Sequence, residues 1–117
     1  MKTGGRIIHI GSSMAHYASF PGCSLYTLTK DAITGFNRGL ARDLGPKSIT
    51  VNTVHPGPTN TDMNPEGSEI AKFVALSIAL GRYAKPGEIA NVVVFLASPQ
   101  VSFVIGAEII AGGGFSA

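Results

Sequence analysis

Short apolar runs alternate with longer periodic segments along the chain. Arg6–Ile10 is a β-branched run between glycines, which predicts a buried strand bounded by turns. Residues 12–22 lack periodicity and are expected to form a loop. From Ser24 to Leu44 the pattern is helical, and the Gly45-Pro46 pair predicts the end of this helix.

The long predicted helix carries an apolar row at four-residue spacing, formed by Leu28, Ala32, Phe36 and Leu40. Gly35 and Gly39 lie inside the same helix, where each costs about 1 kcal/mol relative to alanine. Close packing against a sheet or a partner helix is the best explanation of these glycines. We therefore expect the helix to be covered.

The segment after this helix predicts a second strand and an amphipathic helix. Ile49–Val54 is a strand pattern that ends at His55-Pro56-Gly57-Pro58, because proline cannot donate to a strand ladder. Ser68–Leu80 predicts a helix that ends at Gly81. One face of this helix is formed by Ile70, Phe73, Val74 and Ser77.

The last third of the chain predicts a buried helix and a third strand. Pro86 suits a first helical position, and Glu88–Ala97 is apolar almost all round, which indicates deep burial. Ala107–Ala111 predicts a strand followed by three glycines. The order strand, helix, strand, helix, helix, strand is typical of an α/β protein with right-handed crossovers and a parallel sheet. No repeat or linker divides residues 1–117, so we expect one unit.

Composition excludes several classes of protein. With 44% hydrophobic and 14% charged residues, the chain is not of the disordered type. The net charge of +2 comes from dispersed lysines and arginines, so we expect no nucleic-acid partner. Neither a membrane span nor a signal peptide is predicted, which favours a cytoplasmic location. One cysteine and three scattered histidines predict neither a disulfide nor a metal site.

Three polar residues form the most informative set in the sequence. Ser13 lies in the loop after the first strand, where open α/β sheets bind ligands. Tyr26 and Lys30 are four residues apart and so share one helical face, where an ammonium favours the phenolate of a tyrosine. On spacing alone such a pair is more often simply solvated, so both interpretations stay open at this point.

Several motifs in the right order resemble the short-chain dehydrogenase/reductase family. Gly11-Ser12-Ser13, followed thirteen residues after Ser13 by Tyr26-Thr27-Leu28-Thr29-Lys30, is similar to its active-site signature. Residues 51–63 resemble its cofactor-facing loop, and residues 81–98 its closing segment. The resemblance covers the whole chain but only the C-terminal half of the family's usual domain. It implies a partial, Rossmann-like, doubly wound parallel sheet, with the N-terminal cofactor-binding half absent.

The resemblance also implies roles for individual residues. The implied activity is NAD(P)-dependent hydride transfer between a carbonyl and an alcohol, with a small-molecule substrate. Ser13 would orient the substrate oxygen, Tyr26 would act as general acid/base, and Lys30 would assist it and hold the nicotinamide ribose. The backbone of Pro56 and Gly57, with Thr59, would line the nicotinamide, and Thr61 would reach toward the amide or pyrophosphate. Simple turn chemistry is the alternative for both threonines.

Some positions depart from the family pattern. His16 and Gly87 replace a usual glycine and a usual acidic residue, and Gly112 stands where an aspartate is common. A lone loop histidine such as His16 is expected to be solvated, and Cys23 is expected to be a small packing residue without a chemical role.

No Gly-x-x-x-Gly-x-Gly turn follows a first strand, so the choice between NAD and NADP is not readable. Two rival hypotheses therefore remain. One is a catalytically silent fragment, and the other is a nucleotide-signal-binding module, because one branch of the family includes a cyclic-di-GMP-binding member. We also expect self-association, because Arg6–Ile10 would be an interior strand in the whole family fold.

Overall fold

The computed structural model describes residues 1–117 and contains one parallel sheet of three strands. The strands are β1 (Arg6–Ile10), β2 (Thr50–Pro56) and β3 (Glu108–Ala111), in the spatial order β1-β2-β3. All neighbours run parallel, with Ile10 opposite Val54 and Thr53 opposite Glu108. The α/β class and the parallel sheet predicted from the sequence are confirmed.

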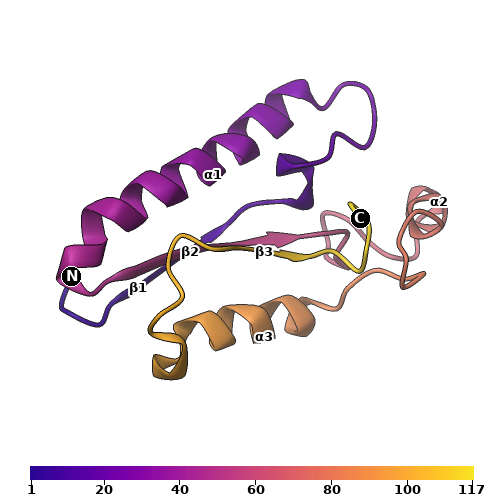
Figure 1. The fold of residues 1–117 in the computed structure, drawn as a ribbon. Coiled ribbons are helices and arrows are strands. Elements are labelled where there is room, and N and C mark those ends of the chain that lie inside the picture. The colour runs from indigo at the N-terminus through magenta and orange to yellow at the C-terminus, as the bar shows by residue number, and fades with distance from the viewer.

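Helices cover both faces of the sheet, as Figure 1 shows. The long helix α1 (Ser24–Leu44) crosses one face, and α3 (Pro86–Ala97) lies on the other, against β1 and β2. This arrangement is the doubly wound layering that the sequence predicts. The remaining helical elements are short: η1 (Ser13–Ala15), η2 (Gly45–Lys47), α2 (Glu69–Ala75) and η3 (Pro99–Val101).

The face of α1 that packs on the sheet is largely polar. Its buried residues are Thr34, Asn37 and Ala41. The amide nitrogen of Asn37 donates to the carbonyl of Ala107, at 3.2 Å, and so ties the helix to the start of β3. Polar side chains occupy this face because they supply hydrogen bonds to the edge of the sheet.

The opposite side of α1 is open, which corrects the expectation of a covered helix. Leu28 and Phe36 of the apolar row are exposed. A Cβ atom built on Gly35 or Gly39 would meet nothing within 4 Å. Within this chain, close packing therefore does not explain these two glycines.

Helix α3 begins as predicted but is not deeply buried. Leu96 is fully buried, whereas Val94 is 68% exposed and Phe95 is also exposed. Deep burial was the wrong expectation because the sheet covers only the side of α3 that faces β1 and β2, and the outer side is open to solvent. No helix in the structure combines the length and the apolar character needed to cross a membrane.

Helix α2 is shorter than the predicted segment Ser68–Leu80. It spans Glu69–Ala75, and the hydroxyl of Ser68 caps it by accepting from the N–H of Ala71 at 3.1 Å. The chain then folds back through turns, and the N–H of Leu80 donates to Gly113 at 3.0 Å. Between these points the N–H groups of Leu76, Ser77 and Ile78 donate to carbonyls three residues back, which is turn geometry and not α-helix, so α2 is shorter than predicted.

The apolar face expected for α2 is also wrong, because Ile70 and Phe73 are both exposed. The helix instead contributes to a small apolar cluster beyond the end of the sheet, near the C-terminus. Its members are Ala71, Ile78 and Tyr83, with Val74 and Phe115 packed against them.

Candidate active site

The carboxyl ends of the three strands lie at one edge of the sheet (Figure 1). β1 leads into η1, which begins with Ser13; β2 leads into the segment 57–61; and β3 leads into the glycines 112–114. Helix α1 begins at Ser24 at the same edge, and Tyr26 lies in its first turn. The topology thus brings every predicted site residue to the edge where open α/β sheets bind ligands.

Ser13 sits in a backbone that hydrogen bonds hold on both sides. The N–H of Gly11 donates to Val54 at 2.8 Å, which is the last rung between β1 and β2. The hydroxyl of Ser12 then caps η1 by accepting from the N–H of Met14 at 3.2 Å. Ser13 itself is only 2% exposed. Local hydrogen bonds and burial therefore fix the position of Ser13.

Tyr26 and Lys30 are neighbours, as their spacing predicts. The ammonium nitrogen of Lys30 lies 5.7 Å from the centre of the Tyr26 ring. A cation at this distance from an aromatic ring is attracted to the face of the ring, so Lys30 and Tyr26 form a cation–π contact. Tyr26 is 47% exposed, so its ring is open to a ligand on the solvent side.

The backbones that follow β2 and β3 approach each other at Gly57. Its N–H donates to the carbonyl of Ala111 at 3.0 Å. A Cβ atom on Gly57 would lie 2.6 Å from the Cα atom of Gly112, which no side chain tolerates. The glycine at this position therefore allows the Pro56-Gly57 backbone to lie beside the C-terminal glycines.

The hydroxyls of Thr59 and Thr61 both take part in turns. Thr59 donates to the carbonyl of Gly57 at 2.9 Å. The Thr61 hydroxyl oxygen accepts from the N–H of Asn64 at 3.2 Å and keeps its own proton for another acceptor. Turn chemistry, the alternative that the sequence left open, is thus present for both residues. Thr61 retains a free donor for a ligand.

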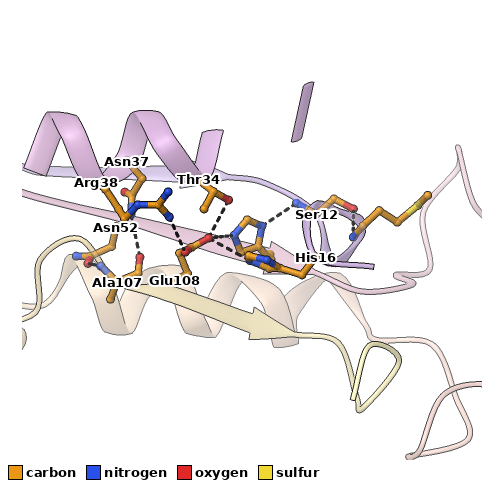
Figure 2. A network of polar contacts seen from close by, with 10 residues as sticks. Ser12, His16, Thr34, Asn37, Arg38, Asn52, Ala107 and Glu108 are labelled. Carbon is orange, nitrogen blue, oxygen red and sulfur yellow. Dashed lines mark hydrogen bonds and ion pairs between the residues drawn. The ribbon is translucent and has the colours of Figure 1, made fainter. Parts of the chain in front are cut away.

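A polar network beside Ser13 is not predicted from the sequence. One carboxylate oxygen of Glu108 accepts from His55 at 2.9 Å, from His16 at 3.2 Å and from Thr34 at 2.9 Å. Figure 2 shows the contacts of Thr34 and His16 converging on Glu108, with Arg38 close to its other oxygen, at 3.8 Å. His16 is exposed, as expected for a loop histidine, but it is also paired with Glu108, which was not expected.

The environment of Glu108 keeps it ionised. Burial raises the pKa of Glu108, but the hydrogen bonds from His55, Thr34 and His16 outweigh this effect and leave the pKa below its ordinary value. One sequence signal could have indicated the network: Glu108 is the single charged residue in an otherwise apolar strand. A charged residue in a buried strand needs partners.

The hydrogen bonds of His55 define its tautomer. The ring is fully buried, and its Nδ1 accepts the backbone N–H of Ser12 at 3.1 Å. Nδ1 therefore carries no proton, so the proton of the neutral ring is on Nε2 and points to Glu108.

This tautomer also bears on metal binding. The ligand atoms of His16, His55 and Glu108 lie within 4.8 Å of one another, a grouping that the scattered histidines did not suggest. A metal would need the lone pair of His55 Nε2, while a metal-bound histidine normally donates, rather than accepts, at its other nitrogen. The geometry favours a hydrogen-bonded network over a metal site.

Comparison with known proteins identifies the family of this chain. Residues 1–116 match the family model described as enoyl-(acyl carrier protein) reductase. The chain also aligns along its whole length with a short-chain dehydrogenase/reductase from Serratia marcescens, at 50% identity and a TM-score of 0.98. The chain belongs to the short-chain dehydrogenase/reductase family. The resemblance drawn from the motifs is thereby confirmed.

Two other similar proteins bear on function. The cyclic-di-GMP-binding biofilm dispersal mediator protein of Escherichia coli (strain K12) is 42% identical over 117 residues, which is 100% of this chain and 49% of that protein. A blue fluorescent protein from a metagenomic library, solved in complex with NADPH, is 47% identical with a TM-score of 0.97 and is covered to 47%. The Serratia structure is covered to 48%. The chain thus spans about half the length of the proteins it matches.

Proposed function

We propose that this chain forms the catalytic half of an NAD(P)-dependent oxidoreductase that interconverts a carbonyl and an alcohol. The observation that carries the proposal is the contact of Lys30 with the Tyr26 ring, whose centre lies 5.7 Å from the ammonium nitrogen. This pair lies at the carboxyl end of the strands, where the loop that contains Ser13 also begins. Family membership and a similar structure that contains NADPH support this interpretation. The substrate is then a small molecule that can reach the exposed Tyr26 ring.

The three residues have complementary tasks in the reduction of a carbonyl. The Ser13 hydroxyl donates a hydrogen bond to the carbonyl oxygen and holds it toward Tyr26. The phenol of Tyr26 gives its proton to that oxygen as the carbon accepts a hydride. The Lys30 ammonium stabilises the phenolate that remains, and solvent returns the proton. NAD(P)H, when bound, supplies the hydride.

The chain also offers groups that suit the nicotinamide end of the cofactor. The Pro56-Gly57 backbone would line the nicotinamide on the side that does not face Gly112, because the backbone of Gly112 already fills the other side of Gly57. Thr61 keeps a hydroxyl proton for a carboxamide or phosphate oxygen. Lys30 and Tyr26 would contact the ribose hydroxyls, and Thr59 would contribute mainly backbone, because its hydroxyl proton is already used.

Tyr26→Phe is the decisive substitution. We would join residues 1–117 behind the N-terminal half of the Serratia marcescens enzyme and follow NAD(P)H consumption with carbonyl substrates; this protein is called the hybrid enzyme below. Tyr26→Phe should lower kcat about 100-fold or more, because it removes the proton donor. Ser13→Ala should cost less, about tenfold, because water replaces part of its hydrogen bond.

Tyr17→Phe is a matched control, because Tyr17 has nearly the same exposure as Tyr26, 45% against 47%, and the proposed mechanism gives its hydroxyl no role. It should leave kcat within about twofold. Lys30→Ala should lower kcat, because the phenolate that remains after proton transfer loses the neighbouring positive charge. If Tyr26→Phe retains most of the activity, the assigned mechanism is wrong.

A second candidate function is binding of a nucleotide signal. Similarity to the cyclic-di-GMP-binding Escherichia coli protein over 117 residues favours it. Calorimetry with cyclic-di-GMP and the 117-residue chain separates the two functions. Binding that survives Tyr26→Phe, together with an inactive hybrid enzyme, would support the signalling function over the oxidoreductase.

A further inference from the structure

The segment 12–16, here called the Ser13 segment, is attached to the rest of the fold at both of its ends. At its start, the Ser12 N–H donates to Nδ1 of His55 at 3.1 Å. At its end, the His16 ring lies 3.2 Å from a carboxylate oxygen of Glu108. The His55 ring reaches the same oxygen at 2.9 Å. Both attachments therefore converge on one oxygen atom of β3, as the view of Ser12, His16 and Glu108 in Figure 2 illustrates.

We propose that Glu108 is a positioning residue for Ser13, with its carboxylate holding both ends of the Ser13 segment. His55 transmits the effect to Ser12, and His16 transmits it directly. The inference rests on the proposed function, because the placement of Ser13 matters for the substrate oxygen that it orients.

The acceptor character of Glu108 is what makes His55 suitable for this task. A neutral histidine carries its proton on one of two nitrogens. An ionised carboxylate can only accept, so it selects the form with the proton on Nε2 and leaves Nδ1 free to accept from Ser12. In the other tautomer the protons of Nδ1 and of the Ser12 N–H would face each other. The contact at the start of the Ser13 segment would then be lost.

Glu108 is itself held in place from two elements. The backbone register fixes it opposite Thr53 in the sheet. Thr34 of α1 donates to it at 2.9 Å, and the Arg38 guanidinium lies 3.8 Å from its second oxygen. The charged and titratable groups around the carboxylate are thus His16, His55 and Arg38, all of which favour its ionised form.

Positioning has a measurable chemical value in such a site. Misplacement of a reacting group by about 1 Å can cost about 100-fold in rate. Ser13 is the second residue after the last ladder rung, at Gly11, and no strand partner holds it. The contacts of His55 and His16 take over where the sheet ends.

The first test uses the unmodified 117-residue chain and nuclear magnetic resonance. Nitrogen shifts of the His55 ring should report a neutral ring with its proton on Nε2, and the Ser12 amide should exchange slowly. A His55 ring with its proton on Nδ1 would overturn the inference without any substitution. If Glu108 had only a structural role, the His55 ring could carry its proton on either nitrogen.

Substitutions at Glu108 then separate the effect of its hydrogen-bond acceptor oxygens from the effect of its side-chain size. Glu108→Leu keeps similar size but accepts no hydrogen bond, so Ser12 amide exchange should become about tenfold faster. Glu108→Gln keeps an acceptor oxygen and should restore the tautomer and most of the protection. The control Glu69→Gln removes a highly exposed carboxylate that is paired only with Lys72, and should change neither signal. Equal Ser12 exchange in all variants would contradict the inference, and if Glu108→Leu fails to fold, the unmodified chain and Glu108→Gln decide.

The second test measures rates in the hybrid enzyme. Glu108→Leu should lower kcat by up to about tenfold, the loss expected for Ser13→Ala, with KM for NAD(P)H unchanged. Glu108→Gln should recover most of it. In the Ser13→Ala background, Glu108→Leu should cost little more, because its effect acts through Ser13. A full additional loss in that background would refute the positioning role. An inactive hybrid enzyme with the expected His55 tautomer and Ser12 exchange would instead reject the proposed function alone.

Discussion

Replacing Gly11 by alanine would force the buried His55 ring out of place. The new Cβ atom would lie 2.3 Å from Nδ1 and 2.6 Å from Cε1 of His55, closer than real Cβ contacts ever are. The ring has no free space, because it is fully buried and bonded at both nitrogens, to Ser12 and to Glu108. The substitution therefore both overpacks the site and breaks at least one buried hydrogen bond.

The two effects set the expected magnitude. Overpacking a dense interior costs about 1–3 kcal/mol, and leaving a buried polar group without its partner costs about 1–3 kcal/mol. We expect Gly11→Ala to lower the free energy of unfolding by about 2–6 kcal/mol. For a domain of this size, that corresponds to a fall in Tm of roughly 10 °C or more.

Gly35→Ala is the matched control, because it makes the same chemical change in open space. Nothing lies within 4 Å of a Cβ atom at Gly35, which is inside α1. Alanine favours helix over glycine by about 1 kcal/mol, so this variant should be more stable than the parent. The assay for both variants is urea unfolding of the 117-residue chain, monitored by circular dichroism. The free energies are compared only if the dependence of the free energy of unfolding on urea concentration is the same in all variants.

Two results would refute the reasoning. If Gly11→Ala unfolds within about 0.5 kcal/mol of the parent, an ordinary surface effect, the His55 ring does not lie over Gly11. If Gly35→Ala destabilises the protein, α1 packs closely against another surface at that point, as its glycines suggested in the sequence.

The remaining predictions concern acid stability, self-association through the outer strand β1, and cofactor binding. Hydrogen bonds from the Arg82 side chain and the Lys85 N–H lower the pKa of Glu88 to about 2. Since this folded pKa lies below the ordinary value of 4.5, the stabilisation is complete above about pH 4.5 and is lost as the pH falls toward 2. Glu88→Gln should flatten that part of an acid-unfolding curve, and an unchanged curve would count against the pair. Strand Arg6–Ile10 pairs only with β2, so the 117-residue chain should self-associate at micromolar concentration in sedimentation; a monodisperse monomer with slow amide exchange at residues 6–10 would contradict this. The same chain should bind NAD(P)H weakly, because it offers only nicotinamide-side groups, and a micromolar Kd in calorimetry would overturn that expectation.

Local patterns in the sequence were sufficient for most of the architecture. The β-branched run at 6–10 and the helix that ends at Gly45-Pro46 both depend on residues close together in the chain. Backbone hydrogen bonding and side-chain periodicity act over a few residues, so such elements can be predicted without the fold. The proximity of Tyr26 and Lys30 is local in the same sense, because a four-residue spacing in a helix is enough to bring the two side chains together. The second strand was predicted to end at Val54 but continues to Pro56, because β3 pairs with His55 and Pro56.

The extent of burial depended on the tertiary structure. Most of the apolar row of α1 is exposed because it lies on the side of the helix that faces away from the sheet, and most of α3 is exposed because the sheet covers only one side of it. Helix α2 ends at Ala75, and the turns that follow it bring the N–H of Leu80 to the carbonyl of Gly113. Periodicity indicates which face of a helix is apolar, but not whether a partner surface exists.

The Glu108 network was beyond the reach of sequence reasoning for a related reason. His16 and Glu108 are separated by 92 positions, and their contact exists only because the sheet register and the loop after β1 bring them together. Even the state of His55 is a tertiary property, since one nitrogen is bound by the Ser12 N–H and the other by a carboxylate. The sequence by itself determined which chemical groups the chain carries and the local elements that hold them. Only the fold decided which groups meet, because those distances depend on strand register and on how distant loops pack.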